Sequence, residues 1–225
     1  MTKISDNLTQ VRKRIQATAQ KAGRSTSDVT LLAVSKTQGE LAIREAYAAG
    51  QRDFGENYLQ EAEQKRQQLS DLDLSWHFIG SIQSNKAKTL ARAWDWVHCI
   101  DRIKVAEILN RHRPENLDPL NVCLQVNIDN EASKSGCKIS ETGPLALAVS
   151  KLKRLRLRGL MVVPAAENSA RAFKHTREVR DKINETYKLN LDTLSMGMSA
   201  DLDEAIHCDA TIVRVGTAIF GARRK

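Results

Sequence analysis

One lysine stands where the sequence predicts reactive chemistry. Lys36 directly follows the apolar run Thr30-Leu-Leu-Ala-Val-Ser35, which is typical of a buried strand. Side chains alternate along a strand, so Lys36 is expected to share an inward face with Leu32 and Val34. Burial disfavours the ammonium form, and desolvation lowers a lysine pKa by up to roughly 3–5 units, which makes the amine a nucleophile toward aldehydes. The alternative is a structural lysine that reaches solvent or pairs with a carboxylate such as Glu56.

Two late segments have the features of an anion site. Ser199 opens a short helical pattern over residues 200–206, and Gly216-Thr217 directly follows the last apolar run. Glycine lets backbone N–H groups approach an anion, so the two segments together predict a phosphate site. Taken singly, Ser199 is equally compatible with a helix cap and Gly216 with an ordinary turn. Asp201 and Asp203 disfavour an anion nearby unless their side chains point outward.

Arg214 lies inside an apolar run, between Val213 and Val215. A guanidinium keeps its charge at every ordinary pH, so inside a strand it requires an acceptor or an anion. An anionic ligand and a structural carboxylate partner are both compatible with this position. Arg214 is therefore a candidate binding residue whose partner the sequence leaves open.

The elements that must position these residues follow from the periodicity of apolar side chains. Eight short runs are strand-like: residues 30–35, 52–55, 75–80, 96–100, 121–127, 157–163, 192–197 and 211–216. Helical patterns lie between them, at residues 40–49, 57–69, 84–93, 102–112, 144–153 and 167–188. Another precedes the first run, where Ile4, Leu8, Val11 and Ile15 recur at helical spacing before Gly23.

This alternation of strand and helix patterns predicts repeated βα units. Eight units in 225 residues approach the roughly 250 residues of a typical closed barrel. The predicted fold is therefore α/β, a single (β/α)8 TIM-type barrel domain over residues 1–225 with an extra N-terminal helix. An open doubly wound sheet is the alternative, because the second and fourth runs are short. In such barrels the active site forms at the carboxyl ends of the strands, with phosphate commonly held after strands 7 and 8.

Composition narrows the class of protein. Hydrophobic residues make up 41% and charged residues 28% of the chain, which indicates a folded domain rather than disorder. The four cysteines form no CxxC motif, and three of them lie in apolar runs, so neither a redox pair nor a zinc site is expected. No window approaches the roughly 18 apolar residues of a membrane helix. We expect a cytoplasmic protein with no membrane partner.

The net charge of +8 raises the question of a nucleic-acid partner. In the basic tract 151–158, leucines alternate with the charges near its end, as in a helix that leads into a strand. Few aromatic residues are interleaved with the basic ones, and no recognition motif is present. His98, His112, His175 and His207 are scattered without ligand spacing. We therefore expect neither nucleic acid nor a metal ion.

Six runs of the chain together resemble one known family. They are LLAVSKT, FGENYLQE, WHFIGSIQSNK, VNIDNEASKSGC, RGLMVVP and SMGMSADLDEAI…IVRVGTAIFGAR, and they extend over nearly the whole chain. In this order they resemble the pyridoxal phosphate homeostasis proteins, the YggS/PROSC family. The resemblance implies a fold-type III barrel, like the barrel domain of alanine racemase, that binds pyridoxal 5′-phosphate (PLP).

The resemblance also assigns a role to each candidate residue. Lys36 of VSKT would carry PLP as a Schiff base, while Asn57 of GENY and His77 of WHFIG would line the pocket. Ser199, Gly216 and Thr217 would hold the phosphate. Arg214 would face the pyridine nitrogen or its surroundings.

The chain departs from the family pattern at one place. Cys208-Asp209 stands where the resemblance predicts a glycine within AI-x-x-G-x-T, just before the last strand. The substitution is expected to alter the turn into that strand, and it involves none of the candidate ligands.

The resemblance implies a cofactor carrier that buffers PLP or delivers it to PLP-dependent apoenzymes, without robust catalytic turnover. A PLP-dependent amino-acid racemase is the main alternative, since racemases of this barrel type also place an arginine at the ring nitrogen. Those racemases take a catalytic tyrosine from a second, β-rich domain of a partner subunit, whereas the predicted barrel here takes up the chain. A class I aldolase using Lys36 directly on its substrate would need no phosphate site. We expect a monomer.

Overall fold

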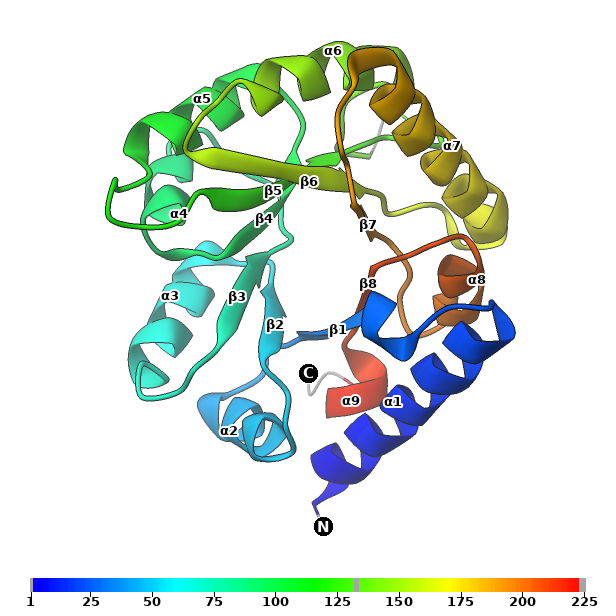
Figure 1. Cartoon of the computed structure of the whole chain (residues 1–225). Coiled ribbons are helices and arrows are strands. Elements are labelled where there is room, and N and C mark those ends of the chain that lie inside the picture. The colour runs from blue at the N-terminus through cyan, green and yellow to red at the C-terminus, as the bar shows by residue number, and fades with distance from the viewer. Residues whose placement is uncertain (1, 132–133, 223–225) are drawn as a thin grey trace.

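A computed structural model describes residues 2–131 and 134–222 of the chain. Parallel strands close into a barrel in which β1 pairs with both β2 and β8. In Figure 1 the strands form the inner ring and the helices the outer one. The strands are β1 Thr30–Val34, β2 Asp53–Glu56, β3 Ser75–Phe78, β4 Trp96–Ile100, β5 Leu120–Gln125, β6 Leu155–Met161, β7 Thr193–Ser195 and β8 Ile212–Val215.

Helices follow the strands in alternation, as the sequence predicts. They are α1 Lys3–Lys21, α2 Glu40–Ala48, α3 Leu59–Gln68, α4 Ala87–Ala93, α5 Ile103–His112, α6 Ile139–Ser150, α7 Ser169–Tyr187, α8 Leu202–His207 and α9 Thr217–Phe220, with 3₁₀ turns at Thr26–Asp28 and Ala166–Asn168. The closed barrel confirms the predicted fold, and the open doubly wound sheet is wrong.

The strands have the burial expected when both faces of a parallel sheet are covered. In β1, the consecutive residues Leu31, Leu32 and Ala33 are all buried, because alternate side chains fill the barrel interior and pack under the outer helices. The same arrangement leaves only the ends of each strand open to solvent. Functional side chains therefore have to stand at these ends or inside the barrel.

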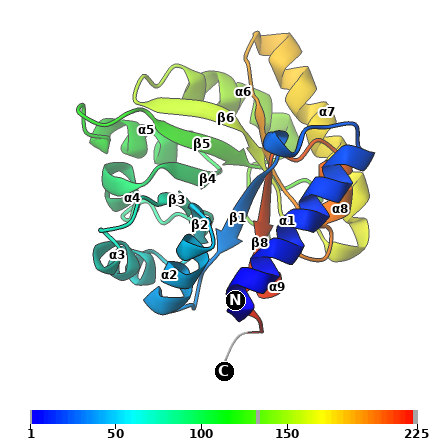
Figure 2. The same ribbon diagram turned by 60° about the horizontal axis from the view of Figure 1, so that its bottom comes forward.

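The N-terminal helix α1 covers the side of the barrel where the chain ends. Its buried residues include Leu8, Val11 and Ile15, the apolar positions whose spacing predicts the helix. Figure 2 shows α1 running alongside β8, α8 and α9, far from them in sequence. In the described ranges, none of the helices has the length and apolarity needed to cross a membrane.

One element begins earlier than the sequence predicts. The pattern places a helix start at Pro144, since proline favours the first helical position. Instead α6 begins at Ile139, and Pro144 lies inside it. The backbone N–H of Lys138 donates to Oε2 of Glu141 at 3.2 Å, so this carboxylate caps the helix a full turn before the proline.

The structure shows the backbone conformation at Asp209, where the family pattern predicts a glycine. Asp209 follows α8 and has φ +66°, in the left-handed region that glycine adopts most easily. Aspartate is among the few other residues found there with some frequency. The turn into β8 therefore has the left-handed conformation that glycine adopts most easily, with aspartate in its place.

Candidate functional site

The carboxyl ends of the strands surround a cavity of about 390 Å³ that contains Lys36. This volume lies within the range of small-molecule sites. Lys36 is half-buried two residues beyond β1, and Arg214 enters from β8. The cavity is lined by Val34, Lys36, Asn57, Ile79, Met161, Val163, Met198, Ser199, Ala200, Arg214, Gly216 and Thr217.

The structure thus brings together six of the seven candidate residues. They come from segments up to 181 positions apart in the sequence, Lys36 to Thr217, and meet because parallel strands all end on one face of the barrel. His77 lies elsewhere. It is 1% exposed inside the barrel, where its ring stacks on Trp96 with centroids 5.4 Å apart and planes within 6°.

Glu56 is the carboxylate considered as a partner for Lys36. It accepts hydrogen bonds from two other side chains. Its Oε1 accepts a hydrogen bond from Oγ of Ser35 at 2.6 Å and one from Nζ of Lys65 at 2.8 Å. Burial raises the pKa of Glu56, while Lys65 opposes that rise. Lys65 also donates to Glu61, so a buried cation is held between two carboxylates next to the lysine strand end. The sequence missed Lys65 because it lies in a helix rich in exposed charges.

Asn57 contributes a polar group that the protein itself leaves unsatisfied. Its Oδ1 is buried and has no hydrogen-bond partner among the described atoms. Such an atom normally finds a partner in protein, water or ligand. Gly80 permits this arrangement, because a Cβ at residue 80 would lie 2.1 Å from the carbonyl oxygen of Asn57. The orphaned acceptor beside the cavity fits a ligand that brings its own donor.

Arg214 is 5% exposed and stays charged at the wall of the cavity. Its Nη1 donates to the carbonyl oxygen and Oγ of Ser195 at 2.5 and 2.9 Å, and its Nη2 donates to the carbonyl of Val162 at 2.8 Å. Burial lowers the pKa of Arg214 to about 10, which still leaves it protonated near neutral pH. These acceptors are all neutral. The arrangement favours an electron-rich ligand over the structural carboxylate that the sequence left open.

The two acidic residues near Ser199 accept hydrogen bonds from groups of the protein. Asp201 accepts the backbone N–H of Met198 through Oδ1 at 2.6 Å. Asp203 accepts hydrogen bonds from the guanidinium of Arg14 at 3.0–3.2 Å and from Thr18 at 2.7 Å. Neither aspartate lines the cavity. The objection that a carboxylate would repel an anion at Ser199 is therefore removed for Asp203, whereas Asp201 still acts on Arg214 and raises its pKa against the effect of burial.

Helix α1 also holds the two segments that predict the phosphate site. Nη1 of Arg14 donates to the carbonyl oxygen of Ser199 at 2.8 Å, and Nδ2 of Asn7 donates to the carbonyl oxygen of Ile219 at the same distance. Both contacts use carbonyl oxygens, so neither occupies an N–H group or a hydroxyl of Ser199, Gly216 or Thr217. The added N-terminal helix therefore has a positioning role, which its sequence pattern did not suggest.

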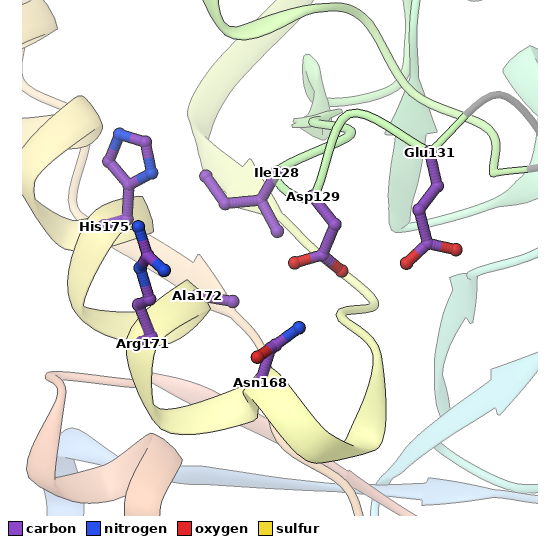
Figure 3. A pocket seen from close by; sticks show the side chains of 7 residues that line it. All are labelled: Ile128, Asp129, Glu131, Asn168, Arg171, Ala172 and His175. Atoms are coloured by element: carbon purple, nitrogen blue, oxygen red, sulfur yellow. The ribbon is translucent and has the colours of Figure 1, made fainter.

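A second cavity, of about 440 Å³, lies beyond the ends of β5 and β6. Figure 3 shows Asp129 and Glu131 on the loop after β5, opposite Arg171 and His175 of α7. Asp129 is already engaged, accepting Nζ of Lys134 at 2.9 Å and the N–H of Ala165 at 2.8 Å. The two cavities share none of their lining residues. Sequence reasoning proposed no site here, and these contacts explain the loop without a ligand.

Comparison with known proteins agrees with the geometry around Lys36. The family model described as alanine racemase, N-terminal domain, matches residues 7–224. A curated relative, the pyridoxal phosphate homeostasis protein of Pseudomonas aeruginosa, is 56% identical, and the match covers 99% of this chain and 97% of that protein. The solved structure of PipY from Synechococcus elongatus with PLP bound is 36% identical, with a TM-score of 0.85, and the match covers 97% of this chain and all of that one.

A more distant likeness concerns the fold alone. Alanine racemase of Clostridium difficile is 12% identical with a TM-score of 0.76, and the match covers 98% of this chain but only 58% of that one. The near relatives match over almost their full length, and the family model covers nearly the whole chain. The chain therefore belongs to the alanine racemase N-terminal domain family and, within it, to the pyridoxal phosphate homeostasis proteins.

Proposed function

We propose that this protein binds PLP, holds it as a Schiff base on Lys36, and takes part in intracellular vitamin B6 homeostasis without robust catalytic turnover. The observation that carries the proposal is the cavity that unites Lys36, the buried Arg214 and the Gly216-Thr217 turn. A solved relative with PLP bound has the same fold over 97% of this chain. The absorption spectrum of the purified protein, before and after adding PLP, tests it. A protein that never acquires a Schiff-base band would refute the proposal.

The residues of the cavity fit the parts of this cofactor. When bound, PLP supplies an aldehyde, which condenses with a primary amine and releases one water. Lys36 is the only primary amine among the lining residues. Arg214 would face the pyridine nitrogen as a donor, and the buried Oδ1 of Asn57 would accept from a ring substituent. Ser199, Gly216 and Thr217 would hold the phosphate with a hydroxyl and backbone N–H groups. His77 is not included, because it lies outside the cavity.

The residues that line the same cavity are poorly equipped for catalysis. Lys36 and Arg214 are the only ionisable side chains among its lining residues, and a guanidinium cannot accept a proton. Removing and returning a proton on opposite faces of an amino acid requires two acid–base groups. Facing the ring nitrogen of PLP, Arg214 would donate a hydrogen bond without giving up its proton, and the ring would then accept electrons less readily. The cavity is therefore better suited to retention than to turnover.

Exchange of the α-proton of alanine in deuterated water should accordingly be slow or undetectable with the wild-type protein loaded with PLP. The signal of the α-proton in ¹H NMR measures this, with free PLP at equal concentration as the control. The likeness to alanine racemase supports the alternative of a racemase-like enzyme. Rapid exchange or racemisation over many turnovers would favour that alternative and exclude the carrier.

We further propose that the chain acts as a monomer and as one domain in the cytoplasm, and that PLP-dependent apoenzymes receive its cofactor. The residues proposed to hold PLP, namely Lys36, Arg214 and the Gly216-Thr217 turn, already line one cavity within a single chain. Sedimentation of the PLP-loaded protein at low concentration should give a species near 25.1 kDa. Loss of PLP on dilution, in step with the dissociation of a dimer, would contradict this.

A further inference from the structure

A continuous row of polar side chains crosses the barrel interior below the Lys36 cavity. Oδ1 of Asp53 lies 3.2 Å from Nε2 of His77, and Nδ1 of His77 lies 3.0 Å from Nε2 of His98. Nδ1 of His98 lies 2.8 Å from Oγ of Ser195, which lies 2.9 Å from Nη1 of Arg214. The row therefore runs from the first residue of β2 to the arginine at the cavity.

The two ends of this row differ in their exposure to bulk solvent. His77, His98, Ser195 and Arg214 are at most 5% exposed, whereas the side chain of Asp53 is 32% exposed. Asp53 stands where the strands begin, on the barrel face opposite the cavity. A proton from solvent thus has access to one end of the row, and the cavity lies at the other.

The chemistry of the two ends fixes the direction of every hydrogen bond between them. Arg214 can only donate, so Oγ of Ser195 accepts from it and its hydroxyl hydrogen is free to donate to Nδ1 of His98. Asp53, as a carboxylate, can only accept, so Nε2 of His77 carries a proton. His98 then carries its proton on Nε2 and donates it to Nδ1 of His77. With both rings neutral, each ring thus has a single tautomer.

The surroundings of the two rings are consistent with this state. Burial, with His77 and Arg214 nearby, holds the pKa of His98 well below its usual range. Nε2 of His77 also lies 3.1 Å from Oγ of Ser75. Trp96, which stacks on His77, has the guanidinium of Arg158 4.9 Å from its ring centre, and Arg158 pairs with Asp192.

We propose that Asp53, His77, His98 and Ser195 form a relay of hydrogen bonds that positions Arg214 and couples its contacts to protonation at the solvent end. Uptake of one proton gives His77 two N–H groups, so Nε2 of His98 must become an acceptor. The proton of His98 is then on Nδ1 and points at Oγ of Ser195. That oxygen now accepts from both His98 and Arg214, and its own hydrogen turns out of the row. Acid therefore weakens the hold of Ser195 on Arg214.

Nitrogen NMR of the histidine rings in the PLP-free protein tests the relay directly. In the relay with both rings neutral, His77 and His98 should each carry the proton on Nε2. On acidification, His98 should change tautomer in the same transition in which His77 takes up its proton. His175→Asn, which removes an exposed histidine outside the barrel, should leave both signals unchanged. A proton on Nδ1 of His98 at neutral pH, or His98 signals that ignore the His77 transition, would overturn the relay.

The effect of the relay on PLP binding in the cavity rests on the proposed function, and a separate experiment measures it. Ser195→Ala should weaken PLP binding about tenfold, since it removes one hydrogen bond to a charged group. The affinity of this variant for PLP should not fall further when the pH is lowered. Ser195→Thr keeps a hydroxyl and should restore both the affinity and the pH dependence of the bound cofactor's spectrum. Equal pH profiles for Ser195→Ala and wild type would overturn the coupling. A protein that binds no PLP would refute the proposed function, while the NMR result would still decide the relay.

Discussion

Replacing Lys36 by alanine is expected to abolish covalent retention of PLP. Borohydride reduces a Schiff base to a stable amine, so wild-type protein reduced in the presence of PLP should carry the label on the peptide that contains Val34-Ser35-Lys36. The label should fall to background in Lys36→Ala. Lys36→Arg should fail as well, because it keeps the charge but has no primary amine. Mass spectrometry of the digested protein measures both.

The controls separate chemistry from folding. Lys88→Ala removes an exposed lysine of α4 and should leave the label on Lys36 unchanged. Lys36 lies beyond the end of its strand and is half-buried. Removing a partly desolvated ammonium from that position is expected to change the free energy of unfolding by no more than about 0.5–1 kcal/mol. Label found mainly on another lysine of the wild-type protein would show that Lys36 is the wrong residue.

The candidate site could be predicted largely because its residues stand at strand ends. Lys36 and Gly216 each follow a short apolar run, and Arg214 lies inside one, so periodicity places them on the barrel without knowledge of side-chain contacts. In a strand whose two faces are both buried, the apolar pattern does not show how far along the barrel axis a polar residue lies. His77 lies in a run as apolar as the others and is the third of the four residues of β3, yet its side chain faces His98 instead of the cavity. How deep a residue lies depends on the stagger between strands, which the local pattern does not encode.

The sequence also could not predict the contacts between elements that are far apart in the chain. Arg14 looks like any polar residue of an amphipathic helix, and only the closed barrel brings it to Ser199 and Asp203. Lys65 has the same appearance in α3, although it is buried against Glu56. Charged residues on a helix are exposed in most cases. Identifying these two as buried or positioning residues requires the arrangement of the elements in space.

Removing the phosphate from the ligand is expected to weaken binding by two to four orders of magnitude. At neutral pH the phosphate of PLP carries about −1.5 to −2 charges and three strong acceptor oxygens. Ser199, Gly216 and Thr217 line the cavity close to the positive charge of Arg214. Losing two charge-assisted hydrogen bonds of roughly 1.5–3 kcal/mol each would cost about 3–6 kcal/mol, which is a factor of about 10² to 10⁴ in Kd. Equilibrium titration with PLP and with pyridoxal measures the difference.

A single substitution shows whether this difference arises at the proposed phosphate site. Ser199→Ala removes a hydroxyl and leaves the backbone N–H groups in place, so it should weaken PLP binding about tenfold. Binding of pyridoxal should change far less, because that ligand carries a neutral hydroxymethyl group in place of the phosphate. Ser140→Ala, an exposed change on α6, is the matched control and should alter neither affinity. If PLP and pyridoxal bind equally well, or if Ser199→Ala weakens both to the same extent, then the phosphate is held somewhere other than between Ser199 and Thr217.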